Sequence, residues 1–414
     1  MRLHVELSGQ FIGVLSGDER TFDFTPARTA IDHFGVGSRA LSVAVPLVAR
    51  PNRAHASRRR SFFEELLPEG DQLEFMLAMA GLRRRDALAF LARFGRDIAG
   101  ALQIWDADNP TEPQTPEARP VSEEDVHVLL TERAANPLAN SGVLGKTSLA
   151  GVQPKIVLAQ LDGGWHQVFG GFPSTHIVKP IVSNRPTEIF DEEYGARFTR
   201  ALGVANFDTH LANFGGTDAL VIQRFDRDLA VPGGRVHQED FNQVLGAAGN
   251  QKYQAYGGIV NLKRIAEVLR THGQANDMRK LAVVTTLGVA ISNLDMHAKN
   301  LGLLHYADGH IALAPAYDFV PHGLREGLDG QLALAVNKKY LHATVTKDDL
   351  VLEFSSWGMR GTKDIVNDTL EQVQVIAARE EPVTQAAIGL AENASATVQH
   401  LLDGRAAGAM EMGP

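Results

Sequence analysis

The sequence contains no cysteine among its 414 residues. This absence excludes disulfide bonds, thiolate nucleophiles and cysteine-based zinc or iron–sulfur sites, and it fits a reducing compartment. No apolar run reaches the roughly 18–20 residues that cross a bilayer, since the longest candidate, residues 281–291, is too short. No apolar segment of a signal peptide follows Met1. We therefore expect a cytoplasmic protein without a membrane partner.

An excess of positive charge is also missing. Lysine and arginine number 40 against 49 aspartates and glutamates, which gives a formal net charge of −9. This balance argues against unaided binding to nucleic acid, although a local basic patch or a DNA-binding partner stays compatible with it. A chain of this length predicts two or three lobes.

Residues 1–105 are expected to form an N-terminal subdomain that is rich in β-strand and carries a helical insert. Two alternating apolar segments around a Ser-Gly turn predict a hairpin at its start. Apolar residues then recur at helical spacing from Ser61 to Arg93. The strands predicted here span residues 3–7, 11–15, 41–45 and 95–105.

A stretch rich in proline and acidic residues separates this subdomain from the rest of the chain. Residues 106–120 have almost no apolar content, which is typical of an exposed linker. A short helix is predicted at residues 122–134. We therefore assign residues 106–139 to a linker and short helix.

The remainder is predicted to form an ATP-binding β lobe over residues 140–236 and an all-helical catalytic lobe over residues 237–414. Thr187 is a candidate N-cap for the one helix of the β lobe. The Asp-Gly pair at 308–309 favours a small hairpin inside the helical lobe. The strands predicted in the β lobe span 156–159, 166–169, 175–179 and 219–222, and its helix spans 187–202. The helices predicted in the helical lobe span 262–271, 277–292, 347–357, 363–380 and 383–400, and the arms of its hairpin span 301–304 and 311–314.

A dense group of polar side chains follows the apolar helix predicted at 277–292. The stretch SNLDMHAKNLGLLH contains Asp295, His297, Lys299 and Asn300 within six residues, and Asp318 lies beyond the small hairpin in ALAPAYDFV. These residue types suit phosphoryl transfer. One carboxylate can orient the proton of an attacking hydroxyl, and an amide oxygen and a second carboxylate can hold Mg²⁺. The pattern therefore favours a kinase site.

The preceding lobe offers the other parts that ATP requires. Lys179 ends the strand THIVK and is placed to contact the α- and β-phosphates. An acidic helix follows it and offers four candidate partners for the lysine, of which Glu193 is the first choice: Glu188, Asp191, Glu192 and Glu193. The segment SLAGVQPK suits a loop that covers the phosphates.

Each of these residues, taken singly, has an ordinary structural explanation. An aspartate or asparagine at a helix end is usually a cap or a solvated group, and a lysine at a strand end usually lies on the surface. His297 has no second histidine or acid at zinc-ligand spacing, so a zinc site is not expected. Only the order of the segments raises the functional interpretation above these alternatives.

In that order the segments resemble the HipA-type serine/threonine kinases, the toxins of bacterial toxin–antitoxin pairs. The resemblance covers nearly the whole chain and implies a bilobal α+β fold of the protein-kinase type. The segments that carry it are FFEELLPEG (62–70), GRDIAGAL (95–102), SLAGVQPK (148–155), THIVKP (175–180), RFDR (224–227), QEDFNQ (238–243), NLDMHAKNLGLL (293–304) and LAPAYDFV (313–320).

The resemblance also implies roles for individual residues. Asp295 would be the catalytic base, and Asn300 and Asp318 would bind Mg²⁺. Ser148 matches the family's autophosphorylated serine, whose modification expels the loop and switches the kinase off. The residues implied to line the ATP site are Ala150, Gly151, Val152, Gln153, Pro154 and Lys155 of the loop, Lys179, Gln223, Arg224 and Phe225 of the adenine hinge, and His297, Lys299, Asn300, Tyr317 and Asp318.

The function implied by the resemblance is phosphorylation of a translation component with ATP and Mg²⁺, which arrests growth. The implied substrate is glutamyl-tRNA synthetase or another aminoacyl-tRNA synthetase, and the implied partner is a small dimeric HipB-like helix-turn-helix antitoxin that binds operator DNA. The residues themselves do not select the substrate. Two alternatives therefore stay open: a small-molecule or lipid kinase with the same catalytic segment, and a non-catalytic co-repressor within an antitoxin–DNA complex.

Overall fold

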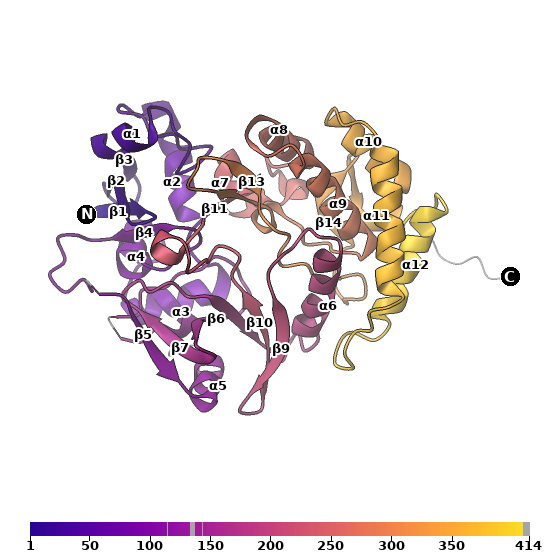
Figure 1. Cartoon of the computed structure of the whole chain (residues 1–414), viewed down its shortest axis with the longest axis horizontal. Helices are drawn as coiled ribbons and strands as arrows, with labels where there is room; N and C mark the ends of the chain where they lie inside the picture. Colours follow the sequence, from indigo (N-terminus) through magenta and orange to yellow (C-terminus); the bar gives the residue numbers. More distant parts are fainter. Residues whose placement is uncertain (114, 133–136, 143, 409–414) are drawn as a thin grey trace. The chain divides into compact units, whose positions relative to one another are not determined.

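The computed structural model describes residues 1–113, 115–132, 137–142 and 144–408. The chain divides into two compact units (Figure 1). The first unit comprises Met1–Val182, His210–Ala248 and Leu304–Gly309, and the second comprises Ser183–Thr209, Gly249–Leu303 and His310–Pro414. The chain combines helices and sheets, as the expected α+β class requires, while the domain boundaries drawn from the sequence stay a prediction.

The first unit begins with a four-stranded sheet in the order β3-β2-β1-β4. The predicted hairpin is confirmed: β1 and β2 pair antiparallel with Leu7 opposite Gln10. The turn residues Ser8 and Gly9 both have positive φ, at 50° and 79°, as the tight turns that match strand twist require. The four strands are β1 (Arg2–Leu7), β2 (Gln10–Ser16), β3 (Asp23–Pro26) and β4 (Leu102–Trp105).

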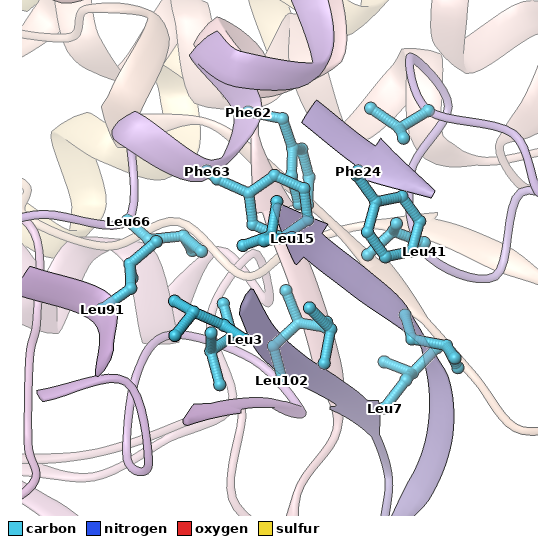
Figure 2. Close-up of a cluster of buried hydrophobic side chains, with 14 of the residues drawn as sticks. Leu3, Leu7, Leu15, Phe24, Leu41, Phe62, Phe63, Leu66, Leu91 and Leu102 are labelled. Atoms are coloured by element: carbon cyan, nitrogen blue, oxygen red, sulfur yellow. The ribbon is translucent and has the colours of Figure 1, made fainter. Parts of the chain in front are cut away.

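Helices cover one face of this sheet and close an apolar core. Phe62 and Phe63 of α2 are fully buried, and the Phe63 ring lies 5.5 Å from the ring of Phe24 on β3. Figure 2 shows these rings in one cluster with leucines of the sheet, among them Leu3, Leu15 and Leu102. The helices of this part are α1 (Arg28–Phe34), α2 (Ala56–Glu64), α3 (Gly70–Ala80) and α4 (Ala87–Phe94).

Two strands predicted in this part are corrected. Residues 41–45 form bends rather than a strand, because the Val43 N–H and the Ser42 hydroxyl donate to the carboxylate of Glu239 (2.9 and 2.5 Å) instead of to a neighbouring strand. Leu41 and Val45 still enter the core. Of the strand predicted over 95–105, only β4 forms.

A six-stranded sheet in the order β5-β7-β6-β8-β10-β9 completes the first unit. The predicted linker is partly wrong, because its end forms β5, which pairs with β7. Within it Glu112 is 5% exposed and binds Arg96 and Lys146 at 2.9 and 2.7 Å. The strands are β5 (Glu117–Val121), β6 (Ile156–Leu161), β7 (Gly164–Phe169), β8 (His176–Pro180), β9 (Thr209–Phe214) and β10 (Thr217–Gln223).

Three shorter elements of the first unit have clear local causes. Helix α5 (Glu123–Thr131) begins at a capping box made by Ser122 and Asp125, while its predicted end at Ala134 lies outside the described residues. Strand β11 (His237–Asp240) leads into α7 (Phe241–Leu245) through a second capping box.

The second unit is built around α9, whose apolar residues face neighbours on several sides. Helix α9 contacts α6, α8, α11 and α12, which explains why its sequence is apolar around most of its circumference. Helix α6, grouped by sequence with the β lobe, belongs to this unit. The helices are α6 (Glu188–Ala201), α8 (Leu262–His272), α9 (Asp277–Ala290), α10 (Lys347–Ser356), α11 (Thr362–Ala377) and α12 (Leu390–Leu402).

The second unit also departs from the prediction in two places. It is not all-helical, because β14 (Gln331–Val336) and β15 (Lys339–Leu341) form a hairpin. The last helix starts at Leu390 rather than near 383, since Gly389 has a left-handed φ of 83° and the Ala387 N–H is bound by Asp191 at 2.8 Å.

The small hairpin predicted beside the polar cluster is confirmed. Strands β12 (Gly302–His305) and β13 (Ile311–Leu313) are neighbours in one sheet. The Ala314 N–H donates to the Gly302 carbonyl at 2.8 Å. None of the helices in the described part of the chain has the length and apolar character needed to span a bilayer.

We expect His237 to make the first unit sensitive to acid. Its ring is buried, with Nε2 2.7 Å from the Leu41 carbonyl, and burial, reinforced by His305, lowers the pKa of His237 to about 4. The folded state therefore favours neutral histidine, whereas an unfolded histidine titrates near 6.5. The free energy of unfolding should fall as the pH falls through this window, by about 2 kcal/mol between pH 7 and pH 5.

Denaturant unfolding at these two pH values measures the effect. His237→Gln keeps a donor for Leu41 but cannot titrate, so it should lose about 2 kcal/mol less than the wild type between pH 7 and pH 5. Equal losses in the two proteins would contradict the prediction.

Candidate functional site

The polar segment lies in the second unit, directly after α9. At the end of this helix Ser292 adopts a left-handed φ of 59°, and the Asn293 N–H donates to the Gly288 carbonyl at 2.7 Å. These two features end the helix abruptly. The segment that follows is thereby held against the helix end.

Asp295 and Asn300 are held together by the backbone of the segment. The Asp295 N–H donates to Asn293 Oδ1 at 3.2 Å, and the Asp295 carbonyl accepts from the His297 N–H at 2.7 Å and from Asn300 Nδ2 at 2.9 Å. Because the Asn300 amide nitrogen is used in this way, its Oδ1 is the atom oriented to act as a ligand.

Asp318 is brought toward the same place by the residue before it. The Tyr317 hydroxyl donates to the Lys299 carbonyl at 2.6 Å, which joins the segment after β13 to the segment after α9. Asp318 itself has a left-handed φ of 55°, a conformation that costs energy in a residue other than glycine and that often marks a functional site.

The two carboxylates influence one another. Burial, followed by the negative charge of Asp318, raises the pKa of Asp295 to about 6, while the Tyr253 hydroxyl and Lys252 act in the opposite direction. The two negative charges repel each other, so a cation between them would be stabilising. Asp295 is still ionised at neutral pH and is a stronger base than an ordinary aspartate.

The donor set fits Mg²⁺ better than a transition metal. In the described part of the chain, no group of three or more histidine, aspartate or glutamate side chains is placed to share a metal ion. One amide oxygen and one carboxylate are enough for Mg²⁺, which keeps waters and phosphate oxygens as its other ligands. His297 is buried beside Tyr253, with 5.2 Å between the ring centroids, as expected for a supporting residue.

The sequence did not identify Gly195 of α6 as part of this site. A Cβ added there would lie 1.9 Å from the carbonyl oxygen of Phe319, a distance at which atoms overlap. Only glycine therefore lets the chain directly after Asp318 lie against α6. A glycine inside an otherwise regular helix was the available signal.

The lysine expected to bind phosphates lies in the first unit. Lys179 is on β8, opposite Leu220 of β10, and is 6% exposed, so it is not a surface lysine at a sheet edge. Both carboxylate oxygens of Glu193 accept hydrogen bonds from Arg197, at 2.8 and 2.6 Å, and a contact of Glu193 with Lys179 stays a prediction.

The predicted phosphate loop has a defined conformation in the first unit. Lys155 Nζ donates to the Ala150 carbonyl at 3.0 Å, and the Glu69 N–H donates to the Gly151 carbonyl at 3.1 Å. Gly151 has φ 115°, and a Cβ there would lie 2.5 Å from Lys155 Nζ. The loop therefore closes on its own lysine, and the φ of 115° at position 151 is one that favours glycine.

Ser148 lies at the start of this loop and is fully buried. Its N–H donates to the Asp97 carbonyl at 3.0 Å, and its hydroxyl donates to the Leu66 carbonyl at 3.3 Å. The unmodified serine thus helps to hold the loop in the first unit.

The predicted adenine hinge contains a residue that the fold itself requires. The guanidinium of Arg224 is 3% exposed and donates to Asp226, to Ser174 Oγ and to the Ile98 carbonyl. Asp97, Arg227 and Arg235 extend this buried network. The two arginines of the RFDR motif therefore stabilise the fold. A nucleotide contact by Gln223, Arg224 or Phe225 stays a prediction.

Comparison with known proteins matches both parts of the chain to models of one protein family. The family model of the HipA N-terminal domain matches residues 3–105, and that of the HipA-like C-terminal domain matches residues 147–379. The putative kinase Y4mE of Sinorhizobium fredii is 33% identical over 322 residues, which are 74% of this chain and 74% of that protein.

Two further matches, one of sequence and one of structure, are to Shewanella oneidensis. Its serine/threonine-protein kinase toxin HipA is 26% identical over 358 residues, which are 82% of this chain and 79% of that protein. The solved complex of the toxin–antitoxin proteins HipA and HipB with operator DNA contains a chain with a TM-score of 0.78 and 22% identity. The match covers 97% of this chain and 96% of that one, and it shows the shared fold.

Two helical glycines beside Phe319 provide a matched test of the site geometry. Gly195→Ala should destabilise the protein by about 1–3 kcal/mol through overpacking and should displace Asp318, so that phosphoryl transfer falls. Gly288→Ala on α9 meets nothing closer than 3.5 Å, so it should keep activity and the melting temperature. Thermal unfolding and the transfer rate measure both variants, and equal behaviour of the two would contradict the role of the close contact at Gly195.

Proposed function

Because the chain belongs to the family of HipA-like kinases, we propose that it is an ATP- and Mg²⁺-dependent protein serine/threonine kinase acting as the toxin of a toxin–antitoxin pair. The observation that carries this proposal is the arrangement of Asp295, Asn300 and Asp318 in the second unit. The Asn300 amide binds the Asp295 carbonyl at 2.9 Å, and the charge of Asp318 reaches the Asp295 carboxylate.

The roles follow from the chemistry of these groups. Asp295 accepts the proton of the acceptor hydroxyl, since its pKa of about 6 leaves it ionised and suitably basic at neutral pH. Asn300 Oδ1 and the Asp318 carboxylate would be the protein ligands for Mg²⁺. The bound ion would offset the charge of the phosphates.

The first unit would supply the remaining contacts to ATP. We assign Lys179 to the α- and β-phosphates, residues 150–155 to the loop over the phosphates, and residues 223–225 to the adenine hinge. The buried position of Lys179 and the closed loop conformation support this assignment. A lysine in the middle of a sheet is restrained in position, as a phosphate contact requires.

The substrate and partner are proposed from the relatives. The Shewanella protein is named a serine/threonine-protein kinase toxin, and its solved structure contains HipB and operator DNA. We propose a HipB-like helix-turn-helix antitoxin as partner, through which this acidic chain reaches DNA. The proposed substrate is a cytoplasmic translation component, with glutamyl-tRNA synthetase as the first candidate among the aminoacyl-tRNA synthetases.

Asp295→Ala and Asp318→Ala should each remove phosphoryl transfer. Loss of the base costs about 10²–10⁴-fold in rate, and loss of the metal ligand removes the charge compensation. Transfer from radiolabelled ATP measures the rate, and growth after induction should recover in both variants. Retained transfer by Asp295→Ala would refute the assignment.

The same assay separates the alternatives. Label in metabolites or lipids rather than in protein would favour a small-molecule or lipid kinase, and absence of transfer by the wild type with intact repression would favour a non-catalytic co-repressor. Phosphoproteomics after induction, wild type against Asp295→Ala, identifies the substrate. Unchanged phosphorylation of every aminoacyl-tRNA synthetase would refute the proposed target class.

We further propose that Ser148 is the autophosphorylation site that inactivates the kinase. A phosphate dianion cannot be accommodated where Ser148 now lies, because the position is fully buried and faces the Leu66 carbonyl. Modification would require the loop to leave the first unit and would prevent its return. The phosphate loop would then be lost with it.

Incubation with ATP should therefore place phosphate on Ser148, which mass spectrometry detects. Phosphorylation should also increase proteolytic cleavage within residues 144–155, since the loop loses its contacts. Ser148→Ala should keep transfer for longer, and Ser141→Ala, seven residues earlier, is the control that should behave as the wild type. Complete turnover without phosphate on Ser148 would refute autoregulation at this residue.

A further inference from the structure

Tyr253 binds the carboxylate of Asp295, although 42 residues separate them in the chain. The Tyr253 hydroxyl donates to Asp295 Oδ1 at 3.0 Å. No hydrogen bond to the other oxygen, Oδ2, is made by the residues that the structure describes. The two oxygens of the proposed base therefore have different surroundings.

The segment that carries Tyr253 is held in place at several points. Tyr253 lies between two short 3₁₀ helices, Gly249–Lys252 and Gln254–Tyr256. The Gly258 N–H donates to the Tyr253 carbonyl at 3.1 Å, and a Cβ at Gly258 would lie 2.4 Å from that same oxygen. The backbone at Tyr253 is thus tightly folded on itself.

Strand β14 fixes both partners of the hydrogen bond relative to each other. The Ala335 N–H donates to Gln254 Oε1 at 3.0 Å, next to Tyr253. The Ala333 N–H donates to the Leu294 carbonyl at 3.0 Å, next to Asp295. One strand therefore restrains the neighbours of the phenol and of the carboxylate, so their contact is built into the second unit.

The Tyr253 side chain is half-buried, and two neighbouring side chains contact its ring. The ring of His297 lies 5.2 Å away, edge to face, and Lys252 Nζ lies 5.3 Å from the Tyr253 ring centroid. These contacts restrict the rotation of the phenol and keep its hydroxyl directed at Asp295.

We propose that Tyr253 is a positioning residue, whose hydroxyl holds Asp295 Oδ1 so that Oδ2 faces the acceptor hydroxyl. A carboxylate that can rotate presents its basic oxygen only part of the time, and an error of about 1 Å in a reacting group can cost about 10²-fold in rate. This inference rests on the proposed kinase function and adds a residue outside the catalytic segment to it.

Two other arrangements would produce the same contact. Tyr253 could block the base until a substrate displaces it, or its own hydroxyl could be a phosphoryl acceptor. The folded backbone at Tyr253, its restraint by β14 and the contact of its ring with His297 favour a permanent contact over a displaceable one. The three arrangements predict different behaviour when only the hydroxyl is removed.

The test is Tyr253→Phe, which keeps the ring and its packing. Transfer is measured with radiolabelled ATP and casein as the acceptor, because the natural substrate is not identified. We expect kcat to fall by about 10–100-fold, with the KM for ATP within about twofold of the wild type. Tyr256→Phe is the matched control, since Tyr256 is 71% exposed and binds Asp329 at 3.4 Å, and it should behave as the wild type.

Other results would overturn the inference. An unchanged kcat would show that the hydrogen bond does not position the base, and a raised kcat would show that Tyr253 blocks it. Phosphate on Tyr253 would identify an acceptor, and a fall in kcat together with the melting temperature would indicate a purely structural role. Absence of transfer by the wild type, to casein or to itself, would overturn the kinase function along with it.

Discussion

The hydrogen bond from the Asn300 amide to the Asp295 carbonyl holds the proposed site together. It closes a loop of six residues at the end of α9 and orients the amide oxygen of Asn300 away from the backbone. The other parts of the site depend on this closure, because Tyr317 then binds the Lys299 carbonyl and places Asp318 beside the same loop. A short polar segment thus becomes a rigid set of oxygen ligands.

The second unit supports this loop from elements that lie far apart in the sequence. Gly195 of α6 lets the chain after Asp318 approach closely. The carboxylate of Asp277, buried at the start of α9, binds the Leu313 N–H at 2.9 Å and so ties β13 to α9. Strand β14 restrains Leu294 and Gln254. Together these contacts restrain the backbone on both sides of the site residues.

In the first unit, buried charged side chains form a network that stabilises the fold. Asp97 and Asp226 are buried with Arg224, Arg227 and Arg235 in a network that joins residues 97–100 to residues 224–235. Removal of one partner would leave an uncompensated buried charge, which is strongly destabilising. The charged residues of the RFDR motif therefore stabilise the fold. The sequence had predicted a nucleotide contact for Arg224 because this residue lies in the predicted adenine hinge.

The sequence alone determined the elements whose causes are local, along with the polar segment and its resemblance to a kinase family. The β1–β2 turn, the capped helix α5 and the apolar helix α9 follow from residues a few positions apart. Contacts between distant residues decided the rest. Glu239 accepts a hydrogen bond from the Val43 N–H, within residues predicted to form a strand, and the Tyr253 hydroxyl binds the carboxylate of Asp295. Such pairs leave no periodic pattern in the chain, because their partners are chosen by packing in three dimensions and not by spacing along the sequence.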